Sequence, residues 1–535
     1  MKYIFISGGV VSGLGKGITS ASVNLLLKSK GFKVAPVKID MYMNIDSGTL
    51  RPSEHGEVFV TDDGIETDQD LGNYERFLNV SLEKQNYITL GQIFQEVIRK
   101  ERSLEYDGAT VDFIPHVTDE IIRRINSAAK EDTDFIIVEL GGTVGEYKNA
   151  IFYEAARILK LSQPAQNVCF MHVVYIPYLN HIGELKTKPA QASVHILNSL
   201  GIQPDFIVAR AEKPLDKPRL DRLSLFCNVK AENVIANPDI DSIYQLPLLF
   251  EEQGVSKALL THFGLEEKTD TLSEWKTFYT NLTSPEQVLK IGLVGKYFAS
   301  GDYVLSDAYI SVIEALKHAG ANTKTKIEQI WINSEFIEKE GSGILKNVDG
   351  IVIPQGWGSR GAEGKIEAIK YAKDFKMPYL GLCFGMQMAV IEFARNVLGW
   401  EDANSEEVDP QSSHPVIHVM PGQKEYLAKK QYGGTIRLGA WPCLVGENTK
   451  LFDCYNKFPS HFVTKSSIDP SWSEFVKSGS IVSERHRHRY EFNNKYRDEF
   501  EKNGFIISGS SPDGKLVESI EIKDHPFFVG TQFHP

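Results

Sequence analysis

The chain has 535 residues, which is too long for one ordinary hydrophobic core, so two or three domains are expected. Hydrophobic residues at 42% and charged residues at 24% are typical of a soluble globular protein, and a net charge of -12 argues against general binding to nucleic acid or to an anionic membrane. The five cysteines are widely spaced and form no CxxC pair, which argues against a disulfide framework or a zinc site and indicates a reducing cytoplasm.

The first predicted element is an apolar strand at the amino terminus. Residues 1–11 are apolar enough to suggest a signal peptide, but they lead directly into a glycine-rich loop without a cleavage-like sequence. A buried strand is therefore preferred. No other run without charges reaches transmembrane length.

The loop after this strand has the composition of a phosphate-binding cradle. Residues 3–17 are strand and glycine-rich loop, and residues 18–29 have helical spacing. In this order, backbone N–H groups and the helix N-terminus can bind phosphates while Lys16 reaches the terminal one. Gly17 replaces the hydroxyl residue of the standard P-loop, so Mg²⁺ is expected to find its ligands elsewhere. A plain glycine turn is the alternative.

Acidic residues follow the next predicted strands. Residues 37–46 end a strand with Lys38 and carboxylates at its carboxyl end, the edge where open α/β sheets bind ligands. The many carboxylates of residues 55–72 are usually solvated surface, but beside a triphosphate they are suitable Mg²⁺ ligands. Another strand, residues 135–139, ends in Glu139, which is expected to be a Walker-B-like metal ligand.

A basic segment follows the predicted strand at residues 172–176. Residues 183–191, GELKTKPAQ, place two lysines around a threonine ahead of a helix that begins near Pro189. A basic turn is the common alternative, but beside the phosphate loop this segment predicts a second triphosphate clamp. The polar residues 266–286 are predicted to be an interdomain linker, before a strand at residues 288–295.

A cysteine in the second half has the setting of a nucleophile. Residues 377–381 are predicted as a strand and Met386 to Leu398 as a helix, so Cys383 lies on the turn between them in GLCFG. We expect its thiol to face solvent, with the helix dipole favouring the thiolate. A buried structural cysteine is the alternative.

Two further segments complete this chemistry. Residues 352–358 form a strand and a glycine loop that could supply backbone N–H donors to an oxyanion. Near the other end, His534 follows a strand and is the base that a cysteine nucleophile needs. Together with the Cys383 turn, these segments resemble the glutamine amidotransferases that use a Cys–His–Glu triad.

The whole chain resembles the CTP synthase family. The motifs SGGVVSGLGKG, KIDMYMNID, HGEVFVT, ETDQDLG, VELGGTVG, GELKTKPAQ, DSIYQLP, RGAEGK, GLCFGMQ, RHRHRYEFN and GTQFHP occur in the family's order and cover nearly all of it. The resemblance implies an α/β fold with two doubly wound, mainly parallel-sheet domains. Residues 1–265 would form a P-loop, dethiobiotin-synthetase-like amidoligase domain, 266–287 a linker, and 288–535 a class I glutamine amidotransferase domain.

The reaction implied by this resemblance has three steps. ATP phosphorylates the C4 oxygen of UTP, glutamine is hydrolysed at the second site, and its ammonia passes through the protein and displaces phosphate to give CTP. The resemblance also implies Mg²⁺, activation by GTP, feedback inhibition by CTP, and a cytoplasmic homotetramer that can form filaments, with no nucleic-acid or membrane partner.

Site residues of the first domain follow from the resemblance position by position. Lys16 would act on the transferred phosphoryl group, and Asp70 and Glu139 would bind the metal. ATP would contact Gly13, Leu14, Gly15, Lys16, Gly17, Ile18, Lys38, Asp70 and Asp239. UTP or CTP would contact Ser12, Glu146, Tyr147, Lys148, Lys186, Thr187, Lys188, Gln191 and Arg222. His55 matches the place where ammonia leaves its tunnel.

In the second domain, the resemblance makes Cys383 the nucleophile and His534 its base. Glutamine would contact Gly356, Phe384, Gln387, Glu407 and Arg489. The first two would turn backbone N–H groups to the oxyanion, and the other three would hold the α-amino and α-carboxylate groups. On charge alone the run RHRHR around Arg489 could be a nucleic-acid patch, but the overall acidity disfavours this alternative.

Three positions depart from the family pattern. Gln355 stands where glycine is usual, and the acidic pair after GGTVG appears as Glu146-Tyr147-Lys148. The triad glutamate of the family would follow Pro535, which is the last residue of this sequence. These departures keep open a catalytically impaired, nucleotide-binding paralogue with a structural or regulatory role. A third hypothesis is another P-loop amidoligase that amidates a cofactor acid, but KTKPAQ and HGEVFVT favour UTP.

Overall fold

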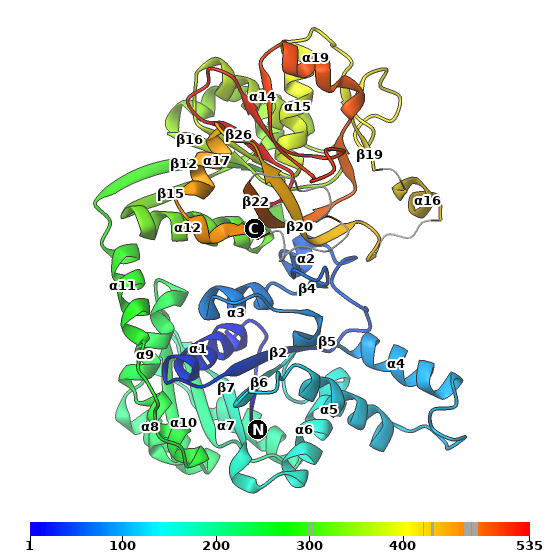
Figure 1. Ribbon diagram of the computed structural model, residues 1–535. Coiled ribbons are helices and arrows are strands. Elements are labelled where there is room, and N and C mark those ends of the chain that lie inside the picture. The colour runs from blue at the N-terminus through cyan, green and yellow to red at the C-terminus, as the bar shows by residue number, and fades with distance from the viewer. Residues whose placement is uncertain are drawn as a thin grey trace. The chain divides into compact units, whose positions relative to one another are not determined.

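The computed structural model describes residues 1–535 except 298, 301, 302, 305, 421, 430–432, 465–471 and 473–479. The chain forms two compact units, each built from two stretches of sequence (Figure 1). Met1–Ser47 and Gln69–Thr280 form the first unit, and Gly48–Asp68 and Asn281–Pro535 form the second. Among the described residues, no helix combines the length and the apolar character needed to cross a bilayer.

The first unit is built on a parallel sheet of seven strands. Their order is β11-β10-β7-β1-β6-β2-β5. The bounds are β1 (Lys2–Gly8), β2 (Val34–Asp40), β5 (Tyr87–Thr89), β6 (Phe135–Leu140), β7 (Val168–Ile176), β10 (Phe206–Ala211) and β11 (Val234–Pro238). Strands buried on both faces need apolar side chains at nearly every position, which explains the continuous apolar runs in the sequence.

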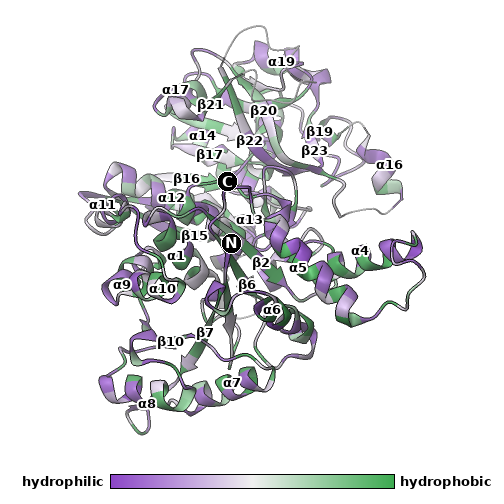
Figure 2. Ribbon diagram, turned by 60° about the horizontal axis from the view of Figure 1, so that its bottom comes forward, coloured by the Kyte–Doolittle hydropathy of each residue, from purple (hydrophilic) through white to green (hydrophobic). Residues whose placement is uncertain are grey.

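Helices cover both faces of this sheet. The alternating side chains of β1 separate two cores, with Tyr3 and Phe5 packing toward α4, α5 and α6, and Ile4 and Ile6 toward α1, α9 and α10. The helices are α1 (Lys16–Ser29), α3 (Asp70–Leu78), α4 (Leu90–Arg102), α5 (Thr118–Ser127), α6 (Ala150–Ser162), α7 (Lys188–Ser199), α8 (Lys217–Cys227), α9 (Leu246–Glu252), α10 (Val255–Phe263) and α11 (Leu272–Thr283). In Figure 2, surface helices such as α4 and α7 carry both hydrophobic and hydrophilic colours, as amphipathic helices do.

The segment predicted as a linker is largely helical. Helix α11 occupies most of residues 266–287, and its first residue, Leu272, is buried. The ring of Trp275 packs 4.9 Å from that of Phe77 and 5.7 Å from that of Tyr244. These aromatic contacts come from residues about 200 and 30 positions away, so the polar composition of the segment did not reveal them.

The second unit has a mixed sheet of ten strands. The order is β15-β12-β16-β17-β26-β25-β24-β20-β22-β21, parallel from β15 to β26 and antiparallel beyond. The bounds are β12 (Gln287–Gly295), β15 (Thr325–Asn333), β16 (Gly350–Ile353), β17 (Tyr379–Leu382), β20 (Arg437–Val445), β21 (Phe462–Val463), β22 (Ser480–His488), β24 (Phe505–Ser510), β25 (Val517–Ile522) and β26 (Phe528–Thr531). The predicted class, two mainly parallel α/β domains, is confirmed.

Helices again lie on both faces of the parallel part of this sheet. Ile351 and Ile353 of β16 pack toward α14 and α15, and Val352 packs toward α12. The main helices of the unit are α12 (Ile310–Thr323), α13 (Ser334–Glu340), α14 (Ala362–Asp374), α15 (Phe384–Asn396), α16 (Gln423–Ala428), α17 (Lys450–Asn456) and α19 (Arg497–Lys502). A small sheet contains β18 (Asn404–Ser405), β19 (Pro415–Val419) and β23 (Tyr490–Phe492).

One segment groups differently from the predicted domain boundary at residue 265. Gly48–Asp68, which contains the short helix α2 (Pro52–His55) and the hairpin of β3 (Phe59–Val60) and β4 (Glu66–Thr67), belongs to the second unit. The backbone N–H of Glu57 donates to Asp307 O at 2.8 Å, and the Glu57 carboxylate accepts from Ser311 N at 2.7 Å. These bonds span about 250 residues, which is why the local sequence did not show the grouping.

Candidate functional site

The predicted phosphate loop lies between β1 and α1. Gly13 and Gly15 have φ values of 73° and 83°, the left-handed region in which glycine is free of Cβ strain. The Lys16 side chain is buried and turns back over the loop, where its ammonium donates to Gly142 O at 2.7 Å. A Cβ at Gly8 would lie 2.8 Å from Lys16 Cδ, so a larger residue there would displace the lysine side chain.

A buried cluster of charges lies beside this loop at the carboxyl ends of β2 and β6. Lys38 pairs in register with Glu139, and its ammonium lies 3.1 Å from Glu139 Oε1 and 3.6 Å from Asp40 Oδ1. It also forms an ion pair with Asp70, the first residue of α3. Burial raises the pKa of Glu139, and the Lys38 charge opposes this. The structure thus brings together the predicted ATP and metal residues Lys16, Lys38, Asp70 and Glu139.

Asp70 lies against the glycine at the end of the loop. A Cβ at Gly17 would lie 2.0 Å from Asp70 Oδ1, so a serine or threonine at this position would displace the Asp70 side chain. A carboxylate is therefore next to the residue that follows Lys16. The Lys38 ammonium donates to the carboxylates of both Asp70 and Glu139. These two carboxylates supply the oxygen donors and the negative charge that suit Mg²⁺.

The predicted triphosphate clamp lies around the start of α7. Lys186 pairs with Glu184 at 2.5 Å, and the Gln191 amide donates to Thr187 Oγ1 at 3.1 Å. Lys188 is exposed and lies over the Phe226 ring of α8. The other predicted nucleotide residues Ser12, Tyr147, Lys148 and Arg222 are exposed, whereas the Glu146 carboxylate accepts from Thr143, and Asp239 pairs with Arg210 at 2.6 Å.

Cys383 occupies a sharp turn between β17 and α15, as predicted. Its φ of 51° and ψ of -101° are strained for a residue with a Cβ, which is a frequent property of functional positions. The expectation that the thiol faces solvent is wrong, because the residue is only 4% exposed. Burial raises the pKa of the thiol to about 12, so the resting form is the neutral thiol.

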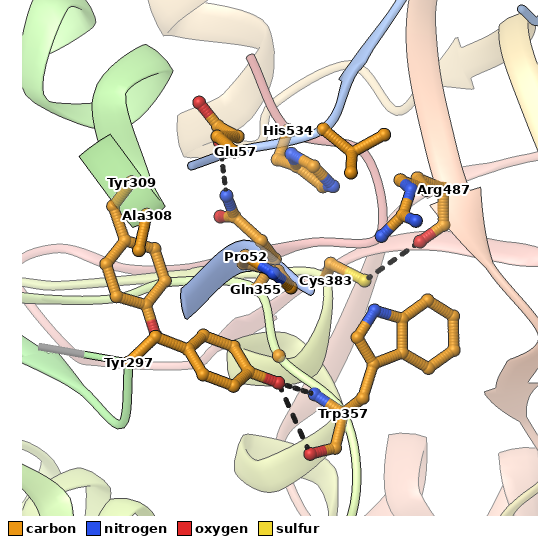
Figure 3. Close-up of a pocket in the computed structure, with 12 residues that line it drawn as sticks. Pro52, Glu57, Tyr297, Ala308, Tyr309, Gln355, Trp357, Cys383, Arg487 and His534 are labelled. Carbon is orange, nitrogen blue, oxygen red and sulfur yellow. Dashed lines mark hydrogen bonds between the residues drawn. The ribbon is translucent and has the colours of Figure 1, made fainter. Parts of the chain in front are cut away.

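A pocket within the second unit contains both Cys383 and His534 (Figure 3). It encloses about 430 Å³, part of it open to solvent, and is lined by Pro52, Glu57, Val58, Tyr297, Ala308, Tyr309, Gln355, Gly356, Trp357, Cys383, Arg487 and His534. His534 Nδ1 lies 3.2 Å from Pro535 O. Because a carbonyl only accepts, Nδ1 carries the proton and Nε2 is left as the basic atom. Burial lowers the pKa of His534 to about 4, which keeps the imidazole neutral.

The loop after β16 presents its backbone to this pocket in a defined orientation. Two lysines hold its carbonyls, with Lys365 Nζ donating to Pro354 O at 3.0 Å and Lys296 Nζ donating to Gly358 O at 2.8 Å. The carbonyls are thereby turned to the lysines. In the described part of the chain, no hydrogen-bond acceptor is recorded for the N–H of Gly356, which lines the pocket. This N–H is available to an oxyanion.

The three side chains predicted to bind glutamine do not line this pocket. Gln387 donates to Tyr490 O at 2.8 Å. Glu407 accepts from Gly358 N at 2.8 Å, and Arg489 donates to Gln423 Oε1 at 3.0 Å. None of these three side chains lines the cavity, although Gly356 does and Phe384 follows Cys383 directly.

Comparisons with known proteins match the two halves of the chain to two family models. Residues 2–265 match the family model of the CTP synthase N-terminus, and residues 304–535 match that of class-I glutamine amidotransferases. The CTP synthase of Caldanaerobacter subterraneus subsp. tengcongensis is 51% identical, with 100% of this chain and 94% of that protein covered. The chain belongs to the CTP synthase family. The CTP synthase of Carboxydothermus hydrogenoformans is 49% identical, with 100% of this chain and 95% of that protein covered.

A solved structure, the glutaminase domain of Trypanosoma brucei CTPS with bound acivicin, is also similar. It is 31% identical, covers 46% of this chain and 86% of that chain, and has a TM-score of 0.38. The resemblance to the CTP synthase family that the motifs predicted is confirmed by the full-length relatives.

Some residues of this CTP synthase family member were missed by the sequence analysis. In the first unit Asp40 and Tyr74 join the charge cluster, where the Tyr74 hydroxyl donates to Glu139. In the second, the Arg487 carbonyl accepts from the Cys383 thiol at 4.0 Å and its guanidinium lies over Trp357. The alternation of RHRHR in a strand was the available signal, since a period of two places its arginines on one face.

The basic side chains of the same strand are paired or buried. Arg485 pairs with Asp62 at 2.5 Å and Arg487 with Glu66 at 2.8 Å, both in the segment 48–68. His486 and His488 are buried. The Gln355 amide likewise donates to Glu57 Oε1 at 2.6 Å, so this departure from the CTP synthase pattern turns its side chain toward the segment 48–68 and leaves Gly356 at the pocket.

Proposed function

We propose that this member of the CTP synthase family catalyses the ATP-dependent amination of UTP to CTP with ammonia from glutamine. The observation that carries the proposal is the presence of two sites on one chain. One is the buried cluster of Lys16, Lys38, Asp70 and Glu139 beside a phosphate loop, and the other is the pocket of Cys383 and His534.

At the first site, the chain's residues would prepare UTP for amination. The uracil C4 carbonyl is a poor electrophile, so its oxygen takes the γ-phosphoryl group of ATP, and ADP leaves. Lys16 neutralises charge on the transferred group. Asp70 and Glu139 would hold Mg²⁺, which when bound supplies further charge neutralisation. Ammonia then attacks C4, the C4–O bond breaks, phosphate leaves, and loss of protons gives CTP.

At the second site, Cys383 and His534 would hydrolyse glutamine. His534 Nε2 takes the thiol proton, and the sulfur attacks the side-chain amide carbon while the Gly356 N–H donates to the oxyanion. The C–N bond breaks, and ammonia leaves with the proton from His534. Water, deprotonated by His534, then cleaves the thioester to glutamate and restores the thiol.

Regulation and assembly rest on the family resemblance. We propose that Ser12, Lys186, Lys188, Gln191 and Arg222 bind the triphosphate of UTP or CTP, and that Asp239 contacts ATP. GTP is proposed as an activator and CTP as a feedback inhibitor of a cytoplasmic homotetramer that can form filaments.

One assay separates this proposal from its alternatives. ATP hydrolysis is measured with ammonia, in the presence and absence of UTP, and CTP is quantified by chromatography. We expect hydrolysis to require UTP and to match CTP formation. No turnover with any nitrogen source would indicate an impaired paralogue, and turnover with another acid in place of UTP would indicate a different amidoligase.

The buried thiol predicts an unusual pH dependence of alkylation. Because burial raises the pKa of Cys383 to about 12, the thiolate fraction rises with pH over the whole range below that value. Without glutamine, alkylation of Cys383 by iodoacetamide should therefore rise about tenfold per pH unit from pH 7 to 10. Mass spectrometry of the Cys383 peptide gives the rate, and free glutathione is the reference. A plateau below pH 8 would contradict the prediction.

Lys148 predicts weak product inhibition. By the family pattern an acidic residue at this position accepts hydrogen bonds from sugar hydroxyls of CTP, whereas the exposed Lys148 only donates. The acceptor Glu146 is already bound by Thr143. Lys148→Glu should tighten CTP inhibition relative to UTP affinity by roughly 10- to 100-fold, the effect of about 1.5–3 kcal/mol. Inhibition constants for CTP and affinities for UTP are compared before and after the change; an unaltered ratio would refute the assignment.

A further inference from the structure

A chain of buried side-chain amides leads to the sulfur of Cys383. Gln387 Nε2 donates to Tyr490 O at 2.8 Å and to Gln532 Oε1 at 3.5 Å. Gln532 Nε2 in turn donates to Cys383 Sγ at 3.7 Å. Gln387 is 2% exposed and Gln532 is 0% exposed, so water does not compete for these groups.

The orientation of each amide in this chain is determined by its neighbour. The Tyr490 carbonyl only accepts, so Gln387 must present its NH₂ group to it. The same NH₂ group meets Gln532, whose oxygen must therefore face Gln387. The NH₂ group of Gln532 is then left facing Sγ. Reversing the Gln532 amide would place its NH₂ group against the NH₂ group of Gln387, with two donors facing each other.

The backbone holds Gln532 in this position. Strand β26 pairs with β17, and Cys383 N donates to Thr531 O at 2.7 Å, directly before Gln532. Gln532 N donates to Glu518 O at 2.8 Å. The Glu518 carboxylate is itself held by Arg437 in two hydrogen bonds of 2.6 and 3.0 Å, with both side chains almost fully buried. The backbone next to Gln532 is thus hydrogen-bonded to the backbone of Cys383, which fixes the position of the amide relative to the sulfur.

A buried sulfur needs such a donor when it becomes negative. Removing the proton from Cys383 leaves a thiolate in a site that excludes water, where an uncompensated charge is costly. Amide donors fixed in advance stabilise developing charge without reorganisation. Among the described residues, the side-chain N–H group that donates to Cys383 Sγ belongs to Gln532.

We propose that Gln532 is a catalytic residue of glutamine hydrolysis, as the side-chain donor that stabilises the Cys383 thiolate. The inference rests on the proposed function, because it requires Cys383 to be the nucleophile. The S–H proton passes to His534, the sulfur charge is stabilised by the Gln532 NH₂ group until the C–S bond forms, and the same donor assists the sulfur when the thioester is cleaved. Gln387 acts as a positioning residue that orients the Gln532 amide.

Gln532→Met is the first test, because methionine keeps the size of the side chain and removes the donor. Glutamine-dependent kcat should fall about 10- to 100-fold, the loss typical of one hydrogen bond to a charged group, with little change in the KM for glutamine. CTP formation from ammonia should remain at the wild-type rate. The control is Gln329→Met, which removes a half-buried amide that donates to Ile313 O.

Gln532→Glu gives a readout that a purely structural role would not move. A neutral carboxylic acid at this position can still donate to sulfur, whereas a carboxylate only accepts and repels the thiolate. The ratio of variant to wild-type glutaminase activity should therefore fall as the pH rises from 6 to 9. Alkylation of Cys383 by iodoacetamide should show the same trend.

The outcomes are distinct. Wild-type kcat with glutamine in Gln532→Met, or a pH-independent activity ratio in Gln532→Glu, would overturn the inference. An equal loss of ammonia-dependent activity would also overturn it, because that reaction does not use the thiolate. Failure of the proposed function itself would be seen in the wild-type enzyme, as absence of glutamine hydrolysis or of CTP.

Discussion

Replacing Cys383 by alanine should abolish CTP formation from glutamine and leave CTP formation from ammonia nearly intact. Only the nucleophile is lost, and the phosphate loop and the charge cluster of the first unit contain none of the residues that line its pocket. Because a thioester cannot form without the sulfur, the glutamine-dependent rate should fall about 10³-fold or more. Parallel assays with glutamine and with an ammonium salt measure the two activities.

Cys454→Ala is the matched control for this experiment. Cys454 is an exposed cysteine of the same unit, on helix α17, and its removal should change neither activity. A loss of ammonia-dependent CTP formation in Cys383→Ala, similar to the loss with glutamine, would contradict the assignment of the two chemistries to two sites. The alanine variant should also resist alkylation at the pocket.

Replacing Lys16 by alanine should stop CTP formation from both nitrogen sources. The Lys16 ammonium donates to Gly142 O at the phosphate loop and interacts electrostatically with Glu139, Asp70 and Asp40, and phosphorylation of UTP must precede amination. Loss of one charged group that stabilises the transferred phosphoryl should lower the rate about 10²- to 10³-fold. Asp70→Asn or Glu139→Gln should act in the same direction, because each removes a carboxylate of the predicted metal site.

Lys28→Ala tests whether this effect is specific to the site. Lys28 lies on the same helix, α1, but in its last turn. Its removal should leave the rate unchanged. Glutamine hydrolysis measured without nucleotides should survive in Lys16→Ala, because Cys383 and His534 are intact. Substantial CTP formation from ammonia by Lys16→Ala would refute the role given to the phosphate loop.

The phosphate loop and the Cys383 turn were predictable from the sequence because each depends on residues that are close together in the chain. The phosphate loop needs a strand, glycines, a lysine and a helix within about 30 residues, and the Cys383 turn needs a strand, two glycines and a helix. The apolar run at the amino terminus likewise predicted a buried strand, and β1 lies inside the seven-stranded sheet. Local order of residue types was sufficient for these elements.

Several decisive features depended on contacts between residues far apart in the chain. The sequence shows a glycine at position 17, but only the folded chain shows that Asp70 fills the space beside it. The turn at Cys383 was predicted with an exposed thiol, whereas residues from other segments bury it. Burial depends on every neighbour in space, so a local pattern does not determine it.

By itself, then, the sequence determined the family and the fold class, and it predicted the nucleophile, the base and the phosphate-binding lysine. Only the tertiary structure decided that Gly48–Asp68 belongs to the second unit. It also decided that the Gln532 amide faces the Cys383 thiol and that Arg487 lines the pocket. The reason is physical: residue types and local spacing set the chemistry that a segment can perform. Strand pairing such as that of β17 with β26 sets which segments meet, and it joins residues about 150 positions apart.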